Sequence, residues 1–206
     1  MRVLVMALLS CLLGLVGICG STLAKESKVH TVDRVDLSRY VGTWYAIASI
    51  PTTFERQCAQ GTTATYTLLE NGQIEVVNIC FTKKGKESVA KGRAWIPDPE
   101  EPAKLKVSFV SLFGWWLFPG DYWIIDLDED YQYAVVGHPA RRYGWILSRT
   151  PVLPDSVLTE IFARIEAQGY DVSTFRTIDQ SIHVKETDGQ APPSEGTETI
   201  PSDQGE

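Results

Sequence analysis

The chain has 206 residues, of which 44% are hydrophobic and 22% are charged, so it is long enough for one soluble globular domain and short for two. Its formal net charge of −7 excludes a general nucleic-acid-binding surface. Six Trp, eight Tyr and seven Phe residues favour a β-rich fold or an apolar cavity.

Residues 1–24 are typical of an export signal. Met1 and Arg2 form a short positive start, an apolar run follows, and small residues around Ala24 suit cleavage. The run is short and broken by glycine, which favours cleavage, with an uncleaved membrane anchor as the alternative. Cys19 is placed for the acylation of a bacterial lipoprotein, but Ile18 is bulkier than that pattern requires. We expect an exported protein of the periplasm or outer membrane, with lipidation at Cys19 possible, or otherwise a secreted one.

Residues 41–149 show the pattern of an all-β domain. Runs of β-forming residues alternate with short turns, and no apolar period of 3.6 residues is present. Evenly spaced strands with short links predict an antiparallel sandwich or an up-and-down barrel. The predicted strands are 42–50, 62–69, 74–81, 87–96, 103–110, 121–127, 132–137 and 143–149.

Cys58 and Cys80 are the two cysteines that follow the expected signal, and such a pair in an exported chain indicates a disulfide. Asn71–Gly72 lies between two strand-like runs and predicts a hairpin. That hairpin places Cys80 opposite Thr63, so the residues just before Thr63, including Cys58, run close to Cys80. Two unpaired thiols are the alternative.

One helix is predicted after Pro154, which suits a first helical turn, and it ends near Gly169. We expect this helix to pack on the outside of the sheet with one apolar face, made by Val157, Leu158, Ile161, Phe162 and Ile165. The last segment, 184–206, holds six acidic residues and one lysine and has few bulky apolar side chains. It is predicted to be a disordered acidic tail.

The alternation within the strands indicates a cavity. Trp44, Ala46 and Ala48 share one face of the first strand, and Leu105, Val107 and Phe109 share the inner face of another. Several inner residues are small, and eight strands form a barrel wide enough for one small ligand. A packed sandwich is the alternative. The residues predicted to line the cavity are Ala46, Ala64, Tyr66, Val76, Asn78, Phe109, Tyr122 and Trp145.

Two loops are candidates for the cavity mouth. The connection 111–120 is apolar and carries Phe113, Trp115, Trp116 and Phe118, which should cover the mouth or touch a membrane. The alternative is that part of it folds back as core. Arg141 and Arg142 in the loop 138–143 are placed to meet a phosphate or carboxylate head group, or are simply solvated.

Several short motifs resemble those of the lipocalin family, and most closely its bacterial outer-membrane branch. Gly42 and Trp44 match the first signature, Gly-x-Trp. Asp128 and Tyr131 occupy the place of the second, although they depart from the usual Thr-Asp-Tyr, and Arg149 matches the third. The resemblance covers about residues 31–178 and implies an eight-stranded antiparallel up-and-down barrel with one C-terminal helix packed outside.

In this family the Trp44 and Arg149 positions close one end of the barrel, with the guanidinium stacked on the indole. The resemblance implies non-catalytic binding, transport or storage of a small hydrophobic or amphipathic ligand, such as a fatty acid or a lysophospholipid, in the cell envelope. We expect this ligand as the partner, with membrane association possible and a monomer or a dimer equally open.

Two alternatives remain open. Some lipocalins are isomerases or de-epoxidases that use a cavity cysteine or an acidic pair. Against an enzyme, none of the three histidines lies in a recognisable triad setting, and no metal-ligand spacing or cofactor motif is present. The second alternative is a binder of pigment, retinoid or haem in the same cavity.

Overall fold

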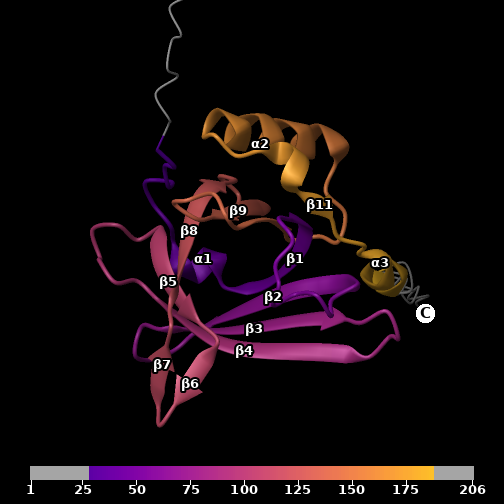
Figure 1. Cartoon of the computed structure of the whole chain (residues 1–206). Coiled ribbons are helices and arrows are strands. Elements are labelled where there is room, and N and C mark those ends of the chain that lie inside the picture. Colours follow the sequence, from indigo (N-terminus) through magenta and orange to yellow (C-terminus); the bar gives the residue numbers. More distant parts are fainter. Residues whose placement is uncertain (1–27, 188–206) are drawn as a thin grey trace, which may run out of the picture.

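The computed structural model describes residues 28–187, so the expected export signal, Cys19 and residues 188–206 lie outside the described part. Figure 1 shows a strongly curved β-structure with the longest helix lying across one side. The elements are α1 (Leu37–Tyr40), β1 (Gly42–Ser49), β2 (Gln60–Leu68), β3 (Ile74–Phe81), β4 (Glu87–Trp95), β5 (Lys104–Ser108), β6 (Val110–Leu112), β7 (Trp115–Leu117), β8 (Gly120–Leu127), β9 (Tyr133–Gly137), β10 (Gly144–Ser148), α2 (Asp155–Ala167), a 3-10 turn η1 (Val172–Thr174), β11 (Arg176–Thr177) and α3 (Ser181–Thr187).

The main sheet closes into a barrel because β1 pairs with β2 on one side and with β10 on the other. Its order is β10-β9-β8-β5-β4-β3-β2-β1, and every neighbouring pair is antiparallel. The short β11 adds to β1 as a ninth strand. The predicted up-and-down barrel is therefore confirmed, and the sandwich is wrong because one continuous sheet closes on itself.

The β2–β3 hairpin turns at Asn71–Gly72 as predicted, but its loop comprises three residues, 70–72. Gly72 has a φ of 76°, a left-handed conformation that glycine adopts without strain. The longer loop places Thr63 opposite Ile79. The predicted pairing of Thr63 with Cys80 is therefore wrong by one residue.

A β-bulge at Ile47 changes the expected pattern of β1, because the pairing with β10 skips this residue between Ala46 and Ala48. Trp44 and Ala46 belong to the apolar cluster inside the barrel, whereas Ile47 and Ala48 belong to a second cluster between the barrel and α2. The expectation that Ala48 shares the face of Trp44 is wrong, since a bulge interrupts the alternation of side chains.

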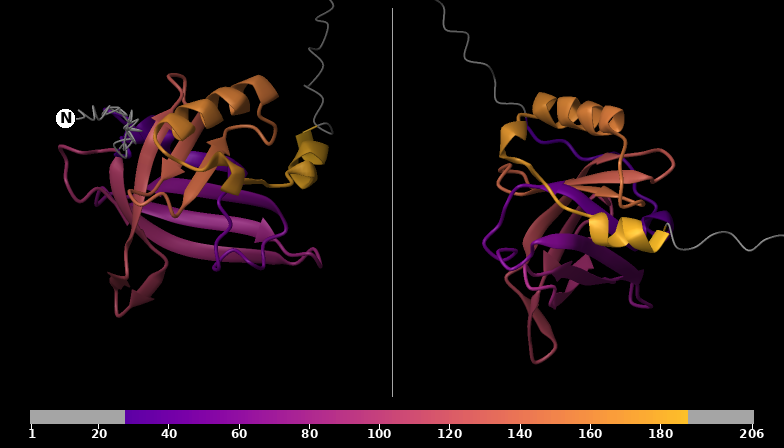
Figure 2. Two further views of the ribbon diagram at one scale, coloured as in Figure 1. Left: turned by 45° about the horizontal axis from the view of Figure 1, so that its top comes forward. Right: turned by 90° about the vertical axis from the view of Figure 1, so that its right-hand side faces the viewer.

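The predicted strand 103–110 also divides in two. β5 ends at Ser108, whose hydroxyl bonds the backbone of Val110 and Leu117, and β6 then pairs with β7 instead of with β4. The lack of a side chain at Gly92 permits this arrangement, because a Cβ there would lie 2.7 Å from the Ser108 carbonyl oxygen. The hairpin β6–β7 projects away from the barrel in Figure 1 and in both views of Figure 2.

Helix α2 packs on the outside of the barrel, as predicted. Ile161 and Ile165 are fully buried, and they contact a cluster that includes Val135 and Ile146 of the barrel wall. The chain leaves the helix at Gly169, whose φ is 84°. α2 therefore covers one side of the barrel from the outside (Figure 2).

The folded part extends past the predicted domain boundary of residue 178. Gln180 is buried, and its side-chain nitrogen donates to the carbonyls of Ala46 at 2.7 Å and Thr62 at 2.8 Å. α3 follows and packs against β2, so the prediction of disorder from residue 184 is wrong for residues 184–187. The expected acidic tail beyond Thr187 lies outside the described residues.

Candidate functional site

The barrel encloses a cavity of about 460 Å³, a volume within the usual range for small-molecule sites. All eight residues that the strand alternation predicts as walls border this cavity. Ala46 and Ala64 leave room for it because larger side chains on the inner faces of β1 and β2 would fill the space. The predicted wall residues are Ala46, Ala64, Tyr66, Val76, Asn78, Phe109, Tyr122 and Trp145.

Three tyrosine hydroxyls meet inside the barrel. The Tyr122 hydroxyl lies 2.8 Å from those of both Tyr40 and Tyr66, and Tyr66 and Tyr122 border the cavity. Burial raises the pKa values of Tyr40 and Tyr122 well above their ordinary value and that of Tyr66 to about 12. All three are therefore neutral hydroxyls at physiological pH. Tyr40 precedes β1, so strand alternation could not have placed it here.

Asn78 supplies a further polar group to the wall. Its side-chain oxygen is buried, and no hydrogen-bond partner lies near it among the described residues. A buried acceptor without a partner is unfavourable by about 1–3 kcal/mol. A ligand that carries a hydrogen-bond donor would remove this penalty.

One end of the barrel is closed by Arg149. Its guanidinium carbon lies 3.7 Å from the centre of the Trp44 ring, and its Nη1 donates to the Thr43 carbonyl at 3.0 Å. Nη2 donates to three further carbonyls, those of Arg39, Tyr40 and Val41. Gly42 fits beside it with a φ of 98°, and a Cβ at this position would lie 3.3 Å from Nη1. The expected stack is therefore present.

The Asp128–Tyr131 turn lies at the same end. Asp128 Oδ2 accepts from the backbone N–H groups of Asp130 and Gln132, which fixes the β8–β9 connection. The Tyr131 hydroxyl accepts from the Asp36 N–H at 2.8 Å, and Tyr131 itself has a φ of 60°. These residues tie the segment before β1 to the barrel and do not border the cavity.

The disulfide between Cys58 and Cys80 is present and joins the loop 50–59 to the end of β3. This link holds Phe54 and Glu55 at the cavity wall, a position that the sequence did not predict. Tyr143 also borders the cavity and was not among the predicted wall residues, although it shares the face of Trp145 in the predicted strand 143–149. Phe54 and Glu55 lie in a loop, where alternation gives no signal. The features of the sequence that could have placed this loop at the cavity are the aromatic residue Phe54 and the nearby Cys58, whose disulfide was predicted.

The hairpin β6–β7 does not cover the cavity mouth. Phe113 at its tip is 94% exposed and Trp115 is 75% exposed, and neither borders the cavity. Trp116 instead lies 5.4 Å from the Arg93 guanidinium carbon, measured from its ring centre. Phe118 alone of the four aromatic side chains borders the cavity. Covering the mouth is therefore the wrong expectation for Phe113, Trp115 and Trp116.

The two arginines predicted at the mouth do not border the cavity either. Arg141 donates from Nε to the Gln168 carbonyl at the end of α2 at 2.8 Å and packs against Gly169. Since carbonyls at a helix C-terminus attract cations, this contact draws Arg141 to the helix. Arg142 is exposed. The predicted role of both residues in head-group binding is not supported, and the solvated alternative describes Arg142.

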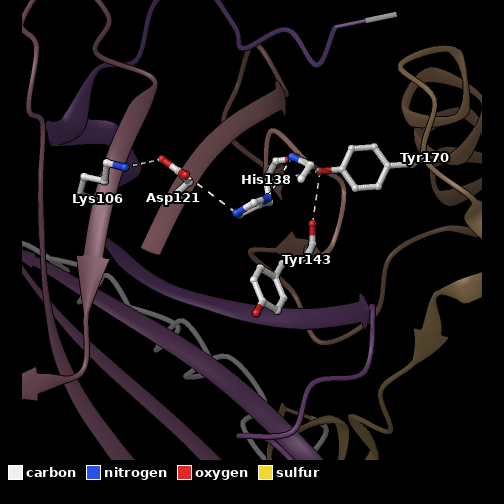
Figure 3. Close-up of polar contacts among 6 residues, drawn as sticks. Lys106, Asp121, His138, Tyr143 and Tyr170 are labelled. Carbon is white, nitrogen blue, oxygen red and sulfur yellow. Dashed lines mark hydrogen bonds and ion pairs between the residues drawn. The ribbon is translucent and has the colours of Figure 1, made fainter. Parts of the chain in front are cut away.

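A polar cluster lies beside the cavity, where β5, β8 and the end of β9 meet (Figure 3). Lys106 donates to Asp121 Oδ1 at 2.7 Å, and His138 Nε2 lies 3.9 Å from Asp121 Oδ2. Burial lowers the pKa of His138, and Asp121 opposes that shift. The Tyr170 hydroxyl accepts from the His138 N–H at 2.8 Å. Asp121 is the member of this cluster that borders the cavity.

No group of three His, Cys, Asp or Glu side chains within residues 28–187 is arranged to hold a metal ion. In the same range, no helix is both long enough and apolar enough to cross a bilayer.

The chain is similar in sequence to several known proteins. A family model described as a lipocalin-like domain matches residues 35–180. Temperature-induced lipocalin-1 of Arabidopsis thaliana is 36% identical over 162 residues, which cover 77% of this chain and 87% of that protein. Outer membrane lipoprotein Blc of Escherichia coli K12 is 40% identical over 153 residues, covering 74% and 83%. Apolipoprotein D of Mus musculus is 35% identical over 157 residues, covering 72% and 79%.

Solved structures share the architecture. The cockroach allergen Per a 4 superposes with a TM-score of 0.59 at 21% identity, covering 78% of this chain and 98% of that one. Insecticyanin of Manduca sexta superposes with a TM-score of 0.58 at 24% identity, covering 73% and 84%. At such identities the likeness concerns the fold alone. The barrel, the Trp44–Arg149 closure and the match over residues 35–180 show together that this chain belongs to the lipocalin family.

Proposed function

We propose that this lipocalin is a non-catalytic carrier or store of an amphipathic lipid, a fatty acid or a lysophospholipid, in the cell envelope. The family binds small hydrophobic ligands, and the observation that carries the proposal is the cavity of about 460 Å³. Its walls are mainly apolar and aromatic. Each methylene group of an acyl chain that is buried there contributes about 0.8 kcal/mol.

The envelope location is supported by the relatives and by the disulfide. Four relatives are named outer membrane lipoprotein Blc, from two strains of Escherichia coli, from Citrobacter freundii and from Vibrio cholerae. The bond between Cys58 and Cys80 suits an oxidising compartment. We infer that the chain is exported, with acylation at Cys19 as the route to a membrane anchor and a soluble secreted form as the alternative.

Mass spectrometry of the intact protein, purified from its own cells under native conditions, tests both points. The expected result is one lipid per chain together with the mass of a processed N-terminus. A protein that carries no lipid and takes up no added lysophospholipid would contradict the carrier function. A coloured preparation with a visible absorption band would instead favour a pigment, retinoid or haem ligand.

An enzymatic role has less support. The candidate nucleophile in the cavity wall, Cys58, is bonded to Cys80 and so presents no free thiol. Titration of free thiols in the folded mature protein gives a direct test. We expect none from Cys58, whereas a reactive thiol at this position would revive the isomerase alternative.

We further propose that the hairpin β6–β7 contacts a lipid bilayer. The hairpin projects from the barrel (Figure 1), and its exposed side chains include Phe113 and Trp115. Aromatic side chains prefer the interface between membrane and water. The variant F113S/W115S should lose binding to phospholipid vesicles in co-sedimentation and should keep its thermal stability. The variant V152S replaces an apolar residue outside the hairpin that is 61% exposed, and it serves as the control. Equal sedimentation of all three proteins would contradict the proposal.

A further inference from the structure

Three aromatic rings form one side of the cavity near its mouth. Phe54, Tyr143 and Trp145, here called the aromatic wall, all border the cavity. The Tyr143 and Trp145 ring centres lie 6.1 Å apart with nearly parallel planes, and the Phe54 ring centre lies 6.1 Å and 6.5 Å from them, respectively. Aromatic faces carry partial negative charge and attract weakly hydrated cations.

A carboxylate is fixed against this aromatic wall. Glu55 borders the cavity, and its Oε1 accepts from the Trp145 ring N–H at 3.1 Å. Its Oε2 accepts from the Thr52 hydroxyl at 2.7 Å. Both donors are neutral, and no basic side chain among those described in residues 28–184 forms an ion pair with Glu55. Its negative charge is therefore held in place, and none of these described side chains neutralises it.

The other charged residues nearby strengthen this asymmetry. Asp121 is the second charged residue on the cavity wall, and Lys106 already neutralises it. Arg141 is turned toward the end of α2, and Arg142 does not border the cavity. The charge that the wall presents to a ligand is therefore negative. This arrangement disfavours an anionic head group at Glu55.

We propose that the aromatic wall and Glu55 form a subsite for a lipid head group that carries a trimethylammonium cation, as in a phosphocholine lysolipid. This inference rests on the lipid-carrier function and specifies its ligand. The methylated cation lies over the ring faces. It binds there more readily than a bare ammonium, which would lose more hydration free energy on leaving water. Glu55 adds electrostatic attraction to the cation. The acyl chain occupies the apolar cavity below.

The direct test compares lipids that share one acyl chain and differ in their head. Lysophosphatidylcholine, lysophosphatidylglycerol and the free fatty acid are titrated below their micellar concentrations by displacement of a fluorescent fatty acid. We expect lysophosphatidylcholine to bind about tenfold more tightly than the two anionic lipids. Equal affinities, or tighter binding of an anionic lipid, would overturn the head-group subsite and leave the carrier function standing. Failure of all three to bind would overturn both.

Two variants locate the preference at the subsite. E55Q removes the charge while keeping a hydrogen-bond acceptor for Trp145, and F54L replaces a side chain that is 58% exposed by another apolar one. Each should weaken lysophosphatidylcholine severalfold and leave lysophosphatidylglycerol unchanged or slightly stronger. E70Q makes the same charge change in the exposed β2–β3 loop and should have no effect. A loss of equal size for both lipids in E55Q and F54L would overturn the proposal.

A last experiment distinguishes a lipid from a soluble choline ester as the source of the cation. Free phosphocholine has the same head and no chain, so it gains none of the apolar burial. At the concentrations at which lysophosphatidylcholine saturates the protein, free phosphocholine should not displace the fluorescent probe. Displacement by phosphocholine as effective as that by lysophosphatidylcholine would show a site for a soluble choline ester and would overturn the lipid assignment.

Discussion

Arg149 lies against Trp44, with its guanidinium carbon 3.7 Å from the indole ring centre, and this pair closes one end of the lipocalin barrel. Trp44 is fully buried, and its ring N–H donates to the Tyr40 carbonyl at 2.8 Å. Arg149 Nη2 donates to the same carbonyl at 3.1 Å. The closure therefore combines a cation–π contact with a shared hydrogen-bond network and ties α1, β1 and β10 together.

Replacing Arg149 should destabilise the fold strongly. R149M keeps part of the apolar stem but removes the guanidinium hydrogen bonds to the backbone carbonyls, of which that of Tyr40 alone is known to keep a second donor, the Trp44 ring N–H. We expect a loss of about 3 kcal/mol in the free energy of unfolding, measured by urea denaturation, since hydrogen bonds to a charged group contribute more than neutral ones. R142M, at an exposed position, should change it by less than about 0.5 kcal/mol. Equal losses in both variants would contradict a closing role for Arg149.

The buried tyrosines predict a loss of stability at high pH. Burial raises the pKa of Tyr66 from 10.0 to about 12 in the folded chain, so folding favours its neutral form. This contribution is complete below pH 10 and is lost as the pH rises from 10 through 12. The free energy of unfolding should fall by about 1.4 kcal/mol per pH unit for this group in that window.

Urea denaturation between pH 9 and pH 11.5 measures this slope, and Y66F isolates it. The variant lacks the titrating hydroxyl, so its stability should fall less steeply above pH 10 than that of the parent. Parallel pH profiles for the two proteins would show that Tyr66 ionises equally easily in the folded and unfolded chains.

The disulfide should stabilise the domain by lowering the conformational entropy of the unfolded chain. Cys58 and Cys80 are 22 residues apart in the sequence, and closing a loop of this size contributes about 3 kcal/mol. The double variant C58S/C80S should lose about that amount in urea denaturation. Reduction of the parent protein should produce a similar loss and should not affect the double variant. A parent protein that is insensitive to reductant would contradict this assignment.

The sequence predicted the cavity walls well where strands are regular. Tyr66, Val76 and Tyr122 follow from alternation alone, because successive side chains of a strand point to opposite faces. The prediction for Ala48 is wrong because it assumes the same alternation. A bulge at Ile47 moves Ala48 to the other face, and a single sequence carries no sign of the bulge.

Loops account for the errors that concern Phe54, Glu55 and Arg141. Phe54 and Glu55 reach the cavity because a disulfide holds their loop there, and their sequence context shows no periodicity. Arg141 had a suitable charge for a head group, but the carbonyl of Gln168 takes its Nε–H. The direction of a loop side chain depends on the tertiary partners that compete for it, and these partners are distant in the sequence.

The most direct test of ligand binding in the barrel fills the cavity from its wall. Ala90 and Val89 are neighbours on β4, and both are exposed, but Ala90 borders the cavity and Val89 does not. The indole of A90W should occupy space that a lipid needs, whereas that of V89W should point to solvent. Both variants should fold with nearly the stability of the parent, because neither adds bulk to the packed core.

The measurement is the uptake of lysophosphatidylcholine by each variant, counted as lipids per chain in native mass spectrometry. We predict one lipid per chain for the parent and for V89W, and a loss of most of the bound lipid for A90W. Equal occupancy of A90W and V89W would show that the lipid lies elsewhere and would contradict the assignment of the barrel cavity as the binding site.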